Sequence, residues 1–114
     1  MNTELGQVVA ERRLRVSDSP NREVWVRLGV PRPFPDDPLN NYYCPYQITG
    51  VGDEQVRYAG GVDSMQALEL ALHLLPTELD RLRQTCPGLG WLDAPDGDYG
   101  FSKTVSSFVA GDPA

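Results

Sequence analysis

Residues 60–75 read GGVDSMQALELALHLL, and this stretch decides how the rest of the chain is organised. It predicts a helix with a chemically marked start, because Asp63 is a typical N-cap residue and Gln66 completes a capping box. The two glycines before it allow a sharp turn out of a strand. Apolar residues cover roughly 220° of this helix, and only Gln66, Glu69 and His73 form a polar stripe. Such a helix must be covered on more than one side.

Composition is that of a single globular domain. The chain has 114 residues, of which 40% are hydrophobic and 23% charged. No apolar run approaches the ~20 residues of a membrane span, and the first residues lack the features of a signal peptide. We therefore expect a cytoplasmic protein without a membrane partner. Cys44 and Cys86 are interpreted as two buried thiols, with a disulfide or a reactive thiol as the alternative.

Charge is distributed unevenly along the chain. Residues 1–35 carry six arginines and four acids, a balance of +2, whereas residues 36–114 carry four basic groups and twelve acids, a balance of −8. The sum is the net charge of −6. Such an acidic protein repels nucleic acid at long range and favours basic partners, although the same balance also serves solubility alone.

Four segments that precede the helix alternate between apolar and polar residues, as strands do. They are residues 8–16, 23–30, 43–49 and 55–59. Arg12 falls on the apolar side of the first segment, which is typical of an edge strand. Pro45 indicates that the third strand begins late or lies partly on an edge. The most economical fold is a two-layer α+β domain, a four-stranded antiparallel meander packed on the helix.

Proline and glycine divide the chain after this helix. Pro76 is expected to end or kink it, and Thr77 then begins a short second helix through about Gln84. Residues 89–101 are expected to form a small hairpin that brings Trp91 and Phe101 onto the body. The domain is thus predicted over residues 1–101, with a loose C-terminal tail over 102–114.

No catalytic, metal or cofactor site is predicted. His73 is the only histidine and shares a helix face with Glu69, so a surface pair is the natural interpretation. Gly60-Gly61 lacks the lysine and the longer glycine pattern of a phosphate loop. Asp93, Asp96 and Asp98 surround a glycine but lack the full ligand series of a calcium loop.

The sheet face away from the helix is the candidate binding surface, because it gathers the residue types that dominate protein interfaces. The alternation assigns to it Arg13, Arg15, Trp25, Arg27, Tyr43, Gln47 and Arg57. One alternative is that the C-terminal hairpin, or Glu11 and Glu23, covers and neutralises this face. Another is that it stacks the bases of single-stranded nucleic acid, which the acidic charge disfavours.

A separate expectation concerns self-association. Leu70 and Leu74 lie on the helix flank opposite Leu68 and Leu72, and one sheet can hardly cover both flanks. We therefore expect a homodimer that buries Leu70 and Leu74.

Two segments carry a resemblance to a family of small bacterial domains of unknown function. They are CPYQI at residues 44–48 and GVDSMQALELAL at residues 61–72, and the similarity extends to residues 9–14 and 90–92. It implies a bacterial origin and transfers no activity and no catalytic residue. More locally, the Gly-x-Asp-x-x-Gln-Ala-Leu corner is similar to that of HicB-type antitoxins.

We interpret the chain as a non-enzymatic protein-binding module, an immunity or antitoxin-type protein that masks a basic partner. The alternatives are an enzyme or small-ligand binder that uses the proline-rich loop 31–38, with Tyr42, Tyr43 and Asp36 or Asp37 near a cleft, and a binder of single-stranded nucleic acid.

Overall fold

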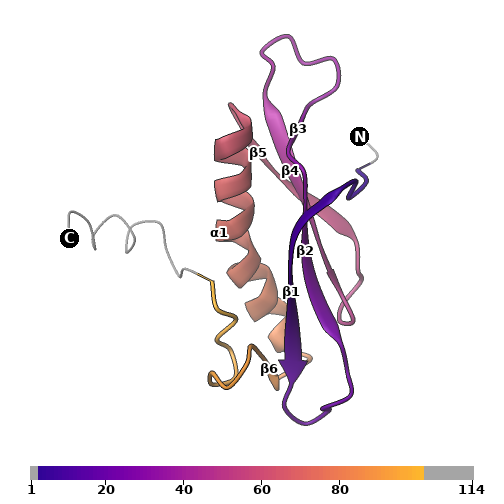
Figure 1. Ribbon diagram of the computed structural model, residues 1–114, viewed down its shortest axis with the longest axis vertical. Helices are drawn as coiled ribbons and strands as arrows, with labels where there is room; N and C mark the ends of the chain where they lie inside the picture. The colour runs from indigo at the N-terminus through magenta and orange to yellow at the C-terminus, as the bar shows by residue number, and fades with distance from the viewer. Residues whose placement is uncertain (1–2, 102–114) are drawn as a thin grey trace, which may run out of the picture.

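The computed structural model describes residues 3–101 as an antiparallel sheet with one long helix across one face (Figure 1). The elements in chain order are β1 Val8–Val16, β2 Val24–Gly29, β3 Arg32–Pro33, β4 Tyr42–Thr49, β5 Val56–Gly61, α1 Ser64–Arg83 and β6 Leu89–Gly90. The predicted tail over 102–114 lies outside the described residues.

The four long strands are neighbours in the order β1, β2, β4 and β5, and each pair is antiparallel. The predicted α+β meander on a helix is confirmed, but the sheet has six strands rather than four. Two short strands make the difference, since β3 pairs with the start of β4 and β6 with the end of β1. A two-residue strand carries too little alternation to be recognised in a sequence.

The core lies between α1 and one face of the sheet. Strand positions facing the helix are apolar and buried, as strand alternation requires. They include Leu14, Val24, Val26, Cys44, Ile48 and Ala59. From α1 the buried residues are Ala67, Ala71, Leu75, Leu79 and Leu82. Small residues therefore fill the N-terminal half of this stripe, and leucines fill the C-terminal half.

The corner between β5 and α1 forms as the capping signal predicts. The Asp63 carboxylate accepts a hydrogen bond from the Gln66 N–H at 2.8 Å, and the Gln66 side chain accepts one from the Val62 N–H at 2.8 Å. A Cβ atom on Gly61 would lie 2.5 Å from the backbone nitrogen of Ala67. Glycine is required there because strand and helix backbones meet without space for a side chain.

Replacing Gly61 with alanine should therefore lower the free energy of unfolding by about 1–3 kcal/mol, as overpacking typically does. Gly60 supplies the matched control, because its added Cβ would lie 3.6 Å from the Phe34 ring, an ordinary contact. Gly60→Ala should change the unfolding free energy by less than about 1 kcal/mol. Urea denaturation of both variants checks this, and equal losses would contradict the close approach at Gly61.

Pro76 does not end the helix, and the predicted second helix over 77–84 was wrong. The helix α1 is continuous from Ser64 to Arg83 with Pro76 inside it. Proline costs the helix one hydrogen bond, but Leu75 and Leu79 on either side are fully buried, and their packing keeps one register. The ribbon bends along its length (Figure 1), as proline-containing helices do.

Pro45 does not delay its strand, since β4 begins at Tyr42, but it does lie where β4 lacks a ladder partner on one side. On the other side it opposes Tyr58 of β5. The sheet adapts on the side of β4 that faces β2 and β3. Leu28 opposes Tyr46 and Arg32 opposes Tyr43. Between these two pairs, the segment that joins β2 to β3 has one residue more than β4. This bulge is a place where a strand tolerates a proline without an N–H.

Residues 89–101 follow the prediction in part. The Trp91 N–H donates to the Asp98 carbonyl at 3.0 Å and the Gly97 N–H to the Leu89 carbonyl at 2.9 Å, so the segment doubles back. Trp91 and Phe101 pack against the core as expected. However, the strand that forms here, β6, pairs with β1.

Both cysteines are free and buried, which confirms that interpretation. Burial raises the pKa of the Cys44 thiol to about 11, so it stays protonated near neutral pH. Within residues 3–101 there is no helix with the length and apolar character needed to cross a bilayer.

Candidate protein-binding surfaces

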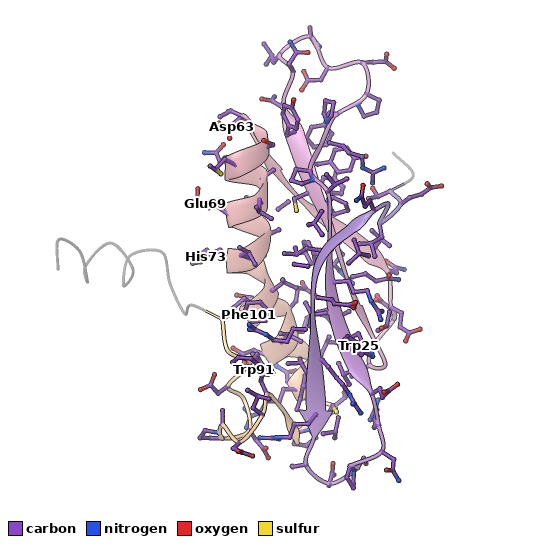
Figure 2. All side chains as sticks on the ribbon, in the orientation of Figure 1. Trp25, Asp63, Glu69, His73, Trp91 and Phe101 are labelled. Atoms are coloured by element: carbon purple, nitrogen blue, oxygen red, sulfur yellow. The ribbon has the colours of Figure 1, made fainter. Side chains whose placement is uncertain are left out.

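The open face, the side of the sheet away from α1, holds four of the seven predicted binding residues in two adjacent cross-strand pairs. Arg13 opposes Trp25 across β1 and β2, and Arg27 opposes Gln47 across β2 and β4. The Arg27 guanidinium carbon lies 5.0 Å from the centroid of the Trp25 ring. Figure 2 shows Trp25 on the opposite side of the sheet from α1, as the alternation predicts.

Acidic neighbours accompany the two arginines of these pairs. Arg13 lies 3.4 Å from a Glu23 oxygen, and Arg27 lies 3.6 Å from a Glu11 oxygen. The sequence offered these two glutamates as the alternative that neutralises the face. Surface pairs of this kind contribute about 0–1 kcal/mol each. Their effect here is to leave little unbalanced positive charge for phosphates, which weakens the nucleic-acid interpretation.

Tyr43 belongs to a different part of the open face. It is buried and packs against Phe34 of the proline-rich loop at a ring-centroid distance of 5.1 Å, and against Tyr58 of β5 at 5.7 Å. The Arg32 guanidinium lies 5.2 Å from the Tyr43 ring. The proline-rich loop is therefore anchored to the sheet by an aromatic cluster. The role of Phe34 could not be predicted because a proline-rich segment has no periodicity, and that of Tyr58 because the short segment 55–59 has an ambiguous phase.

Arg15 holds the segment after α1 rather than standing free. Its guanidinium donates hydrogen bonds to the carbonyls of Leu92 and Gly88, both at 2.9 Å, and to the Asp96 carboxylate at 2.7 Å. That contact lowers the pKa of Asp96. Arg15 is thus occupied by the segment after α1. This agrees with the alternative that the C-terminal hairpin covers part of the open face.

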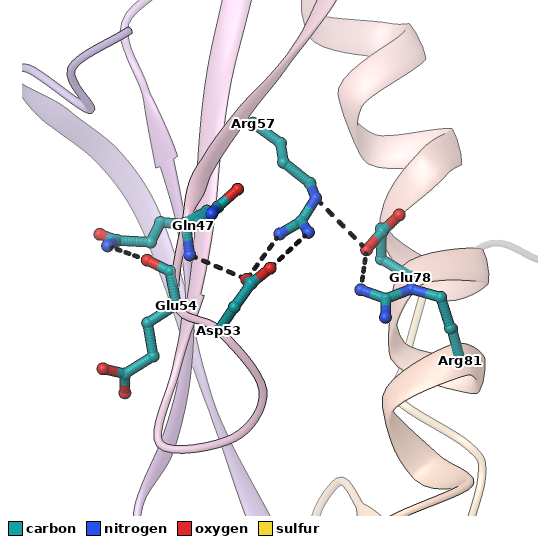
Figure 3. A network of polar contacts seen from close by, with 7 residues as sticks. Gln47, Asp53, Glu54, Arg57, Glu78 and Arg81 are labelled. Atoms are coloured by element: carbon teal, nitrogen blue, oxygen red, sulfur yellow. Dashed lines mark hydrogen bonds and ion pairs between the residues drawn. The ribbon is translucent and has the colours of Figure 1, made fainter.

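The assignment of Arg57 to the open face was wrong. Arg57 opposes Tyr46, a core residue, so its side chain lies on the helix side of β5. Figure 3 shows it between Asp53 of the β4–β5 loop and Glu78 of α1, at 3.0 and 3.8 Å. The five-residue segment 55–59 gave an ambiguous phase because Val56 and Tyr58 are also apolar.

Asp53 gives a pH prediction. Two hydrogen bonds from Arg57 hold the pKa of its carboxyl down to about 2. Because this value is below that of the unfolded chain, near 3.9, the charged form favours folding. The stabilisation is complete above about pH 4 and disappears as pH falls towards 2.

Asp53→Asn should therefore reduce stability at pH 6 and have little effect at pH 2. Urea denaturation of wild type and variant across this pH range checks the expectation. Asp93→Asn is the control, because Asp93 makes no ion pair or side-chain hydrogen bond within residues 3–101. A stability difference for Asp53→Asn that does not depend on pH would contradict the assignment.

The two predicted self-association residues have different environments. Leu74 is half-buried and packs against the core, whereas Leu70 is 38% exposed. The opposite flank also keeps exposed apolar residues, since Leu72 is 39% exposed and Met65 more so. The surplus apolar surface of α1 is thus split between two flanks rather than collected at Leu70 and Leu74.

A feature not recognised in the sequence is the outer edge of β1. This strand pairs with β2 along its length but with β6 only at Arg15 and Val16. Across residues 3–101, no other strand pairs with residues 8–14 on that side. Val8 and Val9 are exposed there, next to a register shift in the pairing with β2. Unpaired N–H and C=O groups of this kind can pair with a strand from another chain.

An apolar groove runs beside this edge, between β1 and α1. We call it the edge groove; its volume is about 120 Å³. It is lined by Ala10, Glu11, Arg12, Val26, Leu28, Leu72, Leu75 and Phe101. The groove exists because α1 contacts mainly β4 and β5 and leaves the N-terminal half of β1 exposed.

Arg12 closes one end of the edge groove. Its guanidinium carbon lies 3.9 Å from the Trp91 ring centroid and 4.7 Å from that of Phe101, and it donates to the Tyr99 carbonyl at 3.0 Å. Figure 2 shows both rings on the helix side of β1. Burial lowers the pKa of this guanidinium. The sequence predicted an inward charge on an edge strand, and the structure confirms it.

Beyond Phe101 lies a second hollow, of about 310 Å³, which we call the acidic cavity. It is lined by Pro76, Thr77, Asp80, Gly97, Asp98, Tyr99 and Phe101. One Asp80 oxygen accepts from the Tyr99 hydroxyl at 2.8 Å, and one Asp98 oxygen accepts from the Gly100 N–H at 3.0 Å. Phe101 lines both the edge groove and the acidic cavity.

Of the residues considered for a site at the proline-rich loop, Asp37 has a structural role. Asp37 accepts backbone hydrogen bonds from Leu39 and Asn41, so its carboxylate stabilises its own loop. Within the described part of the chain, no group of three or more histidine, cysteine or acidic side chains is placed to hold a metal ion.

Taken together, the fold and its surfaces define a two-layer α+β protein in which the outer edge of β1 lies open beside an apolar groove. The chain belongs to a family described as a domain of unknown function, DUF6968, whose model matches residues 10–103. The predicted membership of an uncharacterised domain family is confirmed, whereas the similarity to HicB-type antitoxins is not shown. No curated protein and no solved structure matches the chain.

Proposed function

We propose that this chain is a non-enzymatic, cytoplasmic bacterial module that binds another protein along the outer edge of β1. The observation that carries the proposal is the unpaired edge over residues 8–14 beside the edge groove. An extended segment of a partner would gain main-chain hydrogen bonds from the edge and side-chain contacts from the groove, as strand-addition complexes do.

The acidity of the chain supports a basic partner. The net charge is −6, and an excess of one sign attracts partners of the other sign and speeds their encounter. The proposed role is that of an immunity or antitoxin-type protein, which masks the basic surface of its partner. The paired arginines of the open face make that face a weaker candidate. The homodimer predicted through Leu70 and Leu74 is a separate proposal, which sedimentation of the wild type tests.

Site-specific photocrosslinking tests the location. A photoreactive amino acid at Val9 should crosslink one protein in stoichiometric amount in a lysate of cells that carry the gene. Tyr58 is the matched control, because it is similarly exposed, at 44% against 49%, and lies on the strand at the other side of the sheet. Crosslinking from Tyr58 but not Val9, or from neither at low and moderate salt, would refute the proposal.

A further inference from the structure

The shape and charge next to the β1 edge specify the partner more closely, and this inference rests on the proposed function. We infer that the edge groove receives one large apolar side chain of the partner, and that a nearby lysine or arginine of the same segment enters the acidic cavity. The two sites are adjacent, because Phe101 forms a wall of each.

The apolar half of the inference follows from the groove lining. Ala10, Val26 and Leu28 supply its sheet side, and Leu72 and Leu75 supply its helix side. Leu72 remains 39% exposed, so apolar surface is available to a ligand. An apolar side chain that covers this surface gains about 25 cal/mol for each Å² removed from water.

The cationic half follows from the charged groups that line the two sites, Arg12 in the edge groove and Asp80 and Asp98 in the acidic cavity. Arg12 lines the edge groove and stacks on the Phe101 ring, so a second cation in the groove would be repelled. In the acidic cavity, Asp80 and Asp98 each use one oxygen in an internal hydrogen bond. Within residues 3–101, no arginine lies within 4.0 Å of either carboxylate. The one carboxylate that lines the groove, Glu11, is already paired with Arg27, so a lysine or arginine of the partner is favoured in the cavity over the groove.

The test uses the full-length protein as bait for a phage library of random decapeptides. The selected peptides should share a large apolar residue and a nearby lysine or arginine. Binding of a synthetic selected peptide should weaken as salt is raised. A consensus without a basic residue, or the absence of any selected peptide, would overturn the inference.

Variants with matched controls locate the peptide. Leu72→Lys should weaken binding of the selected peptide roughly tenfold or more, as loss of an interface anchor does. Leu70→Lys adds the same charge at an equally exposed position on the other flank and should leave the affinity within about twofold. Ala10→Lys blocks the groove from the strand side and replaces Leu72→Lys if circular dichroism shows that Leu72→Lys is unfolded.

For the acidic cavity, Asp80→Asn should reduce affinity roughly fivefold to tenfold, as loss of one member of a close charge pair does. Glu69→Gln removes the same charge from an exposed position of the same helix outside the cavity, so it controls for net charge. Equal effects of the two variants would show only global steering and would overturn the cationic half.

The outcomes separate this inference from the proposed function. If Val9 crosslinks a partner whose affinity is unchanged by Leu72→Lys and Asp80→Asn, the protein-binding function holds and this inference fails. If sedimentation of the wild type shows a dimer that Leu72→Lys dissociates, a second copy occupies the groove and the inference also fails.

Discussion

The rest of the structure depends on the close approach of the β5 and α1 backbones at Gly61 and Ala67. Because Gly61 has no side chain, the helix can start directly against the strand that precedes it, and the Asp63 cap satisfies its first N–H groups. Ala67 and Ala71 continue the fully buried stripe of the helix with small side chains. The helix is thereby held over the β4–β5 side of the sheet, and its direction determines which strands it covers.

Because α1 covers β4 and β5, strands β1 and β2 are less protected from solvent, and the rest of the chain covers them only in part. The segment after α1 returns to β1 and covers its C-terminal end through Arg15 and the Arg12–Trp91–Phe101 stack. The N-terminal half of β1 has no equivalent cover within residues 3–101. The edge groove is the space that remains because α1 lies over β4 and β5, and because the segment after α1 covers only the C-terminal end of β1. The surfaces proposed for binding are therefore a direct consequence of how the core is closed.

The fold was largely predictable because its signals are local. Alternation over β1 located both its ends, and the Asp63–Gln66 box located the start of α1. Pro76 misled because its local cost is outweighed by the burial of Leu75 and Leu79, which depends on tertiary packing. The candidate site was less predictable. The face on which Arg57 lies depended on the phase of one short strand. The edge groove depends on which strands the helix leaves uncovered.

The contact of Arg12 with the Tyr99 carbonyl joins residues 87 positions apart in the chain. The chain leaves the ribosome from its N-terminus, so the residues of the meander and of α1 emerge before this segment does. Until then Arg12 lacks its aromatic stack, and β1 is open along its entire outer side. An uncovered edge is a template for pairing with another chain, so docking of the segment after α1 also shortens the length of β1 that is open to mispairing.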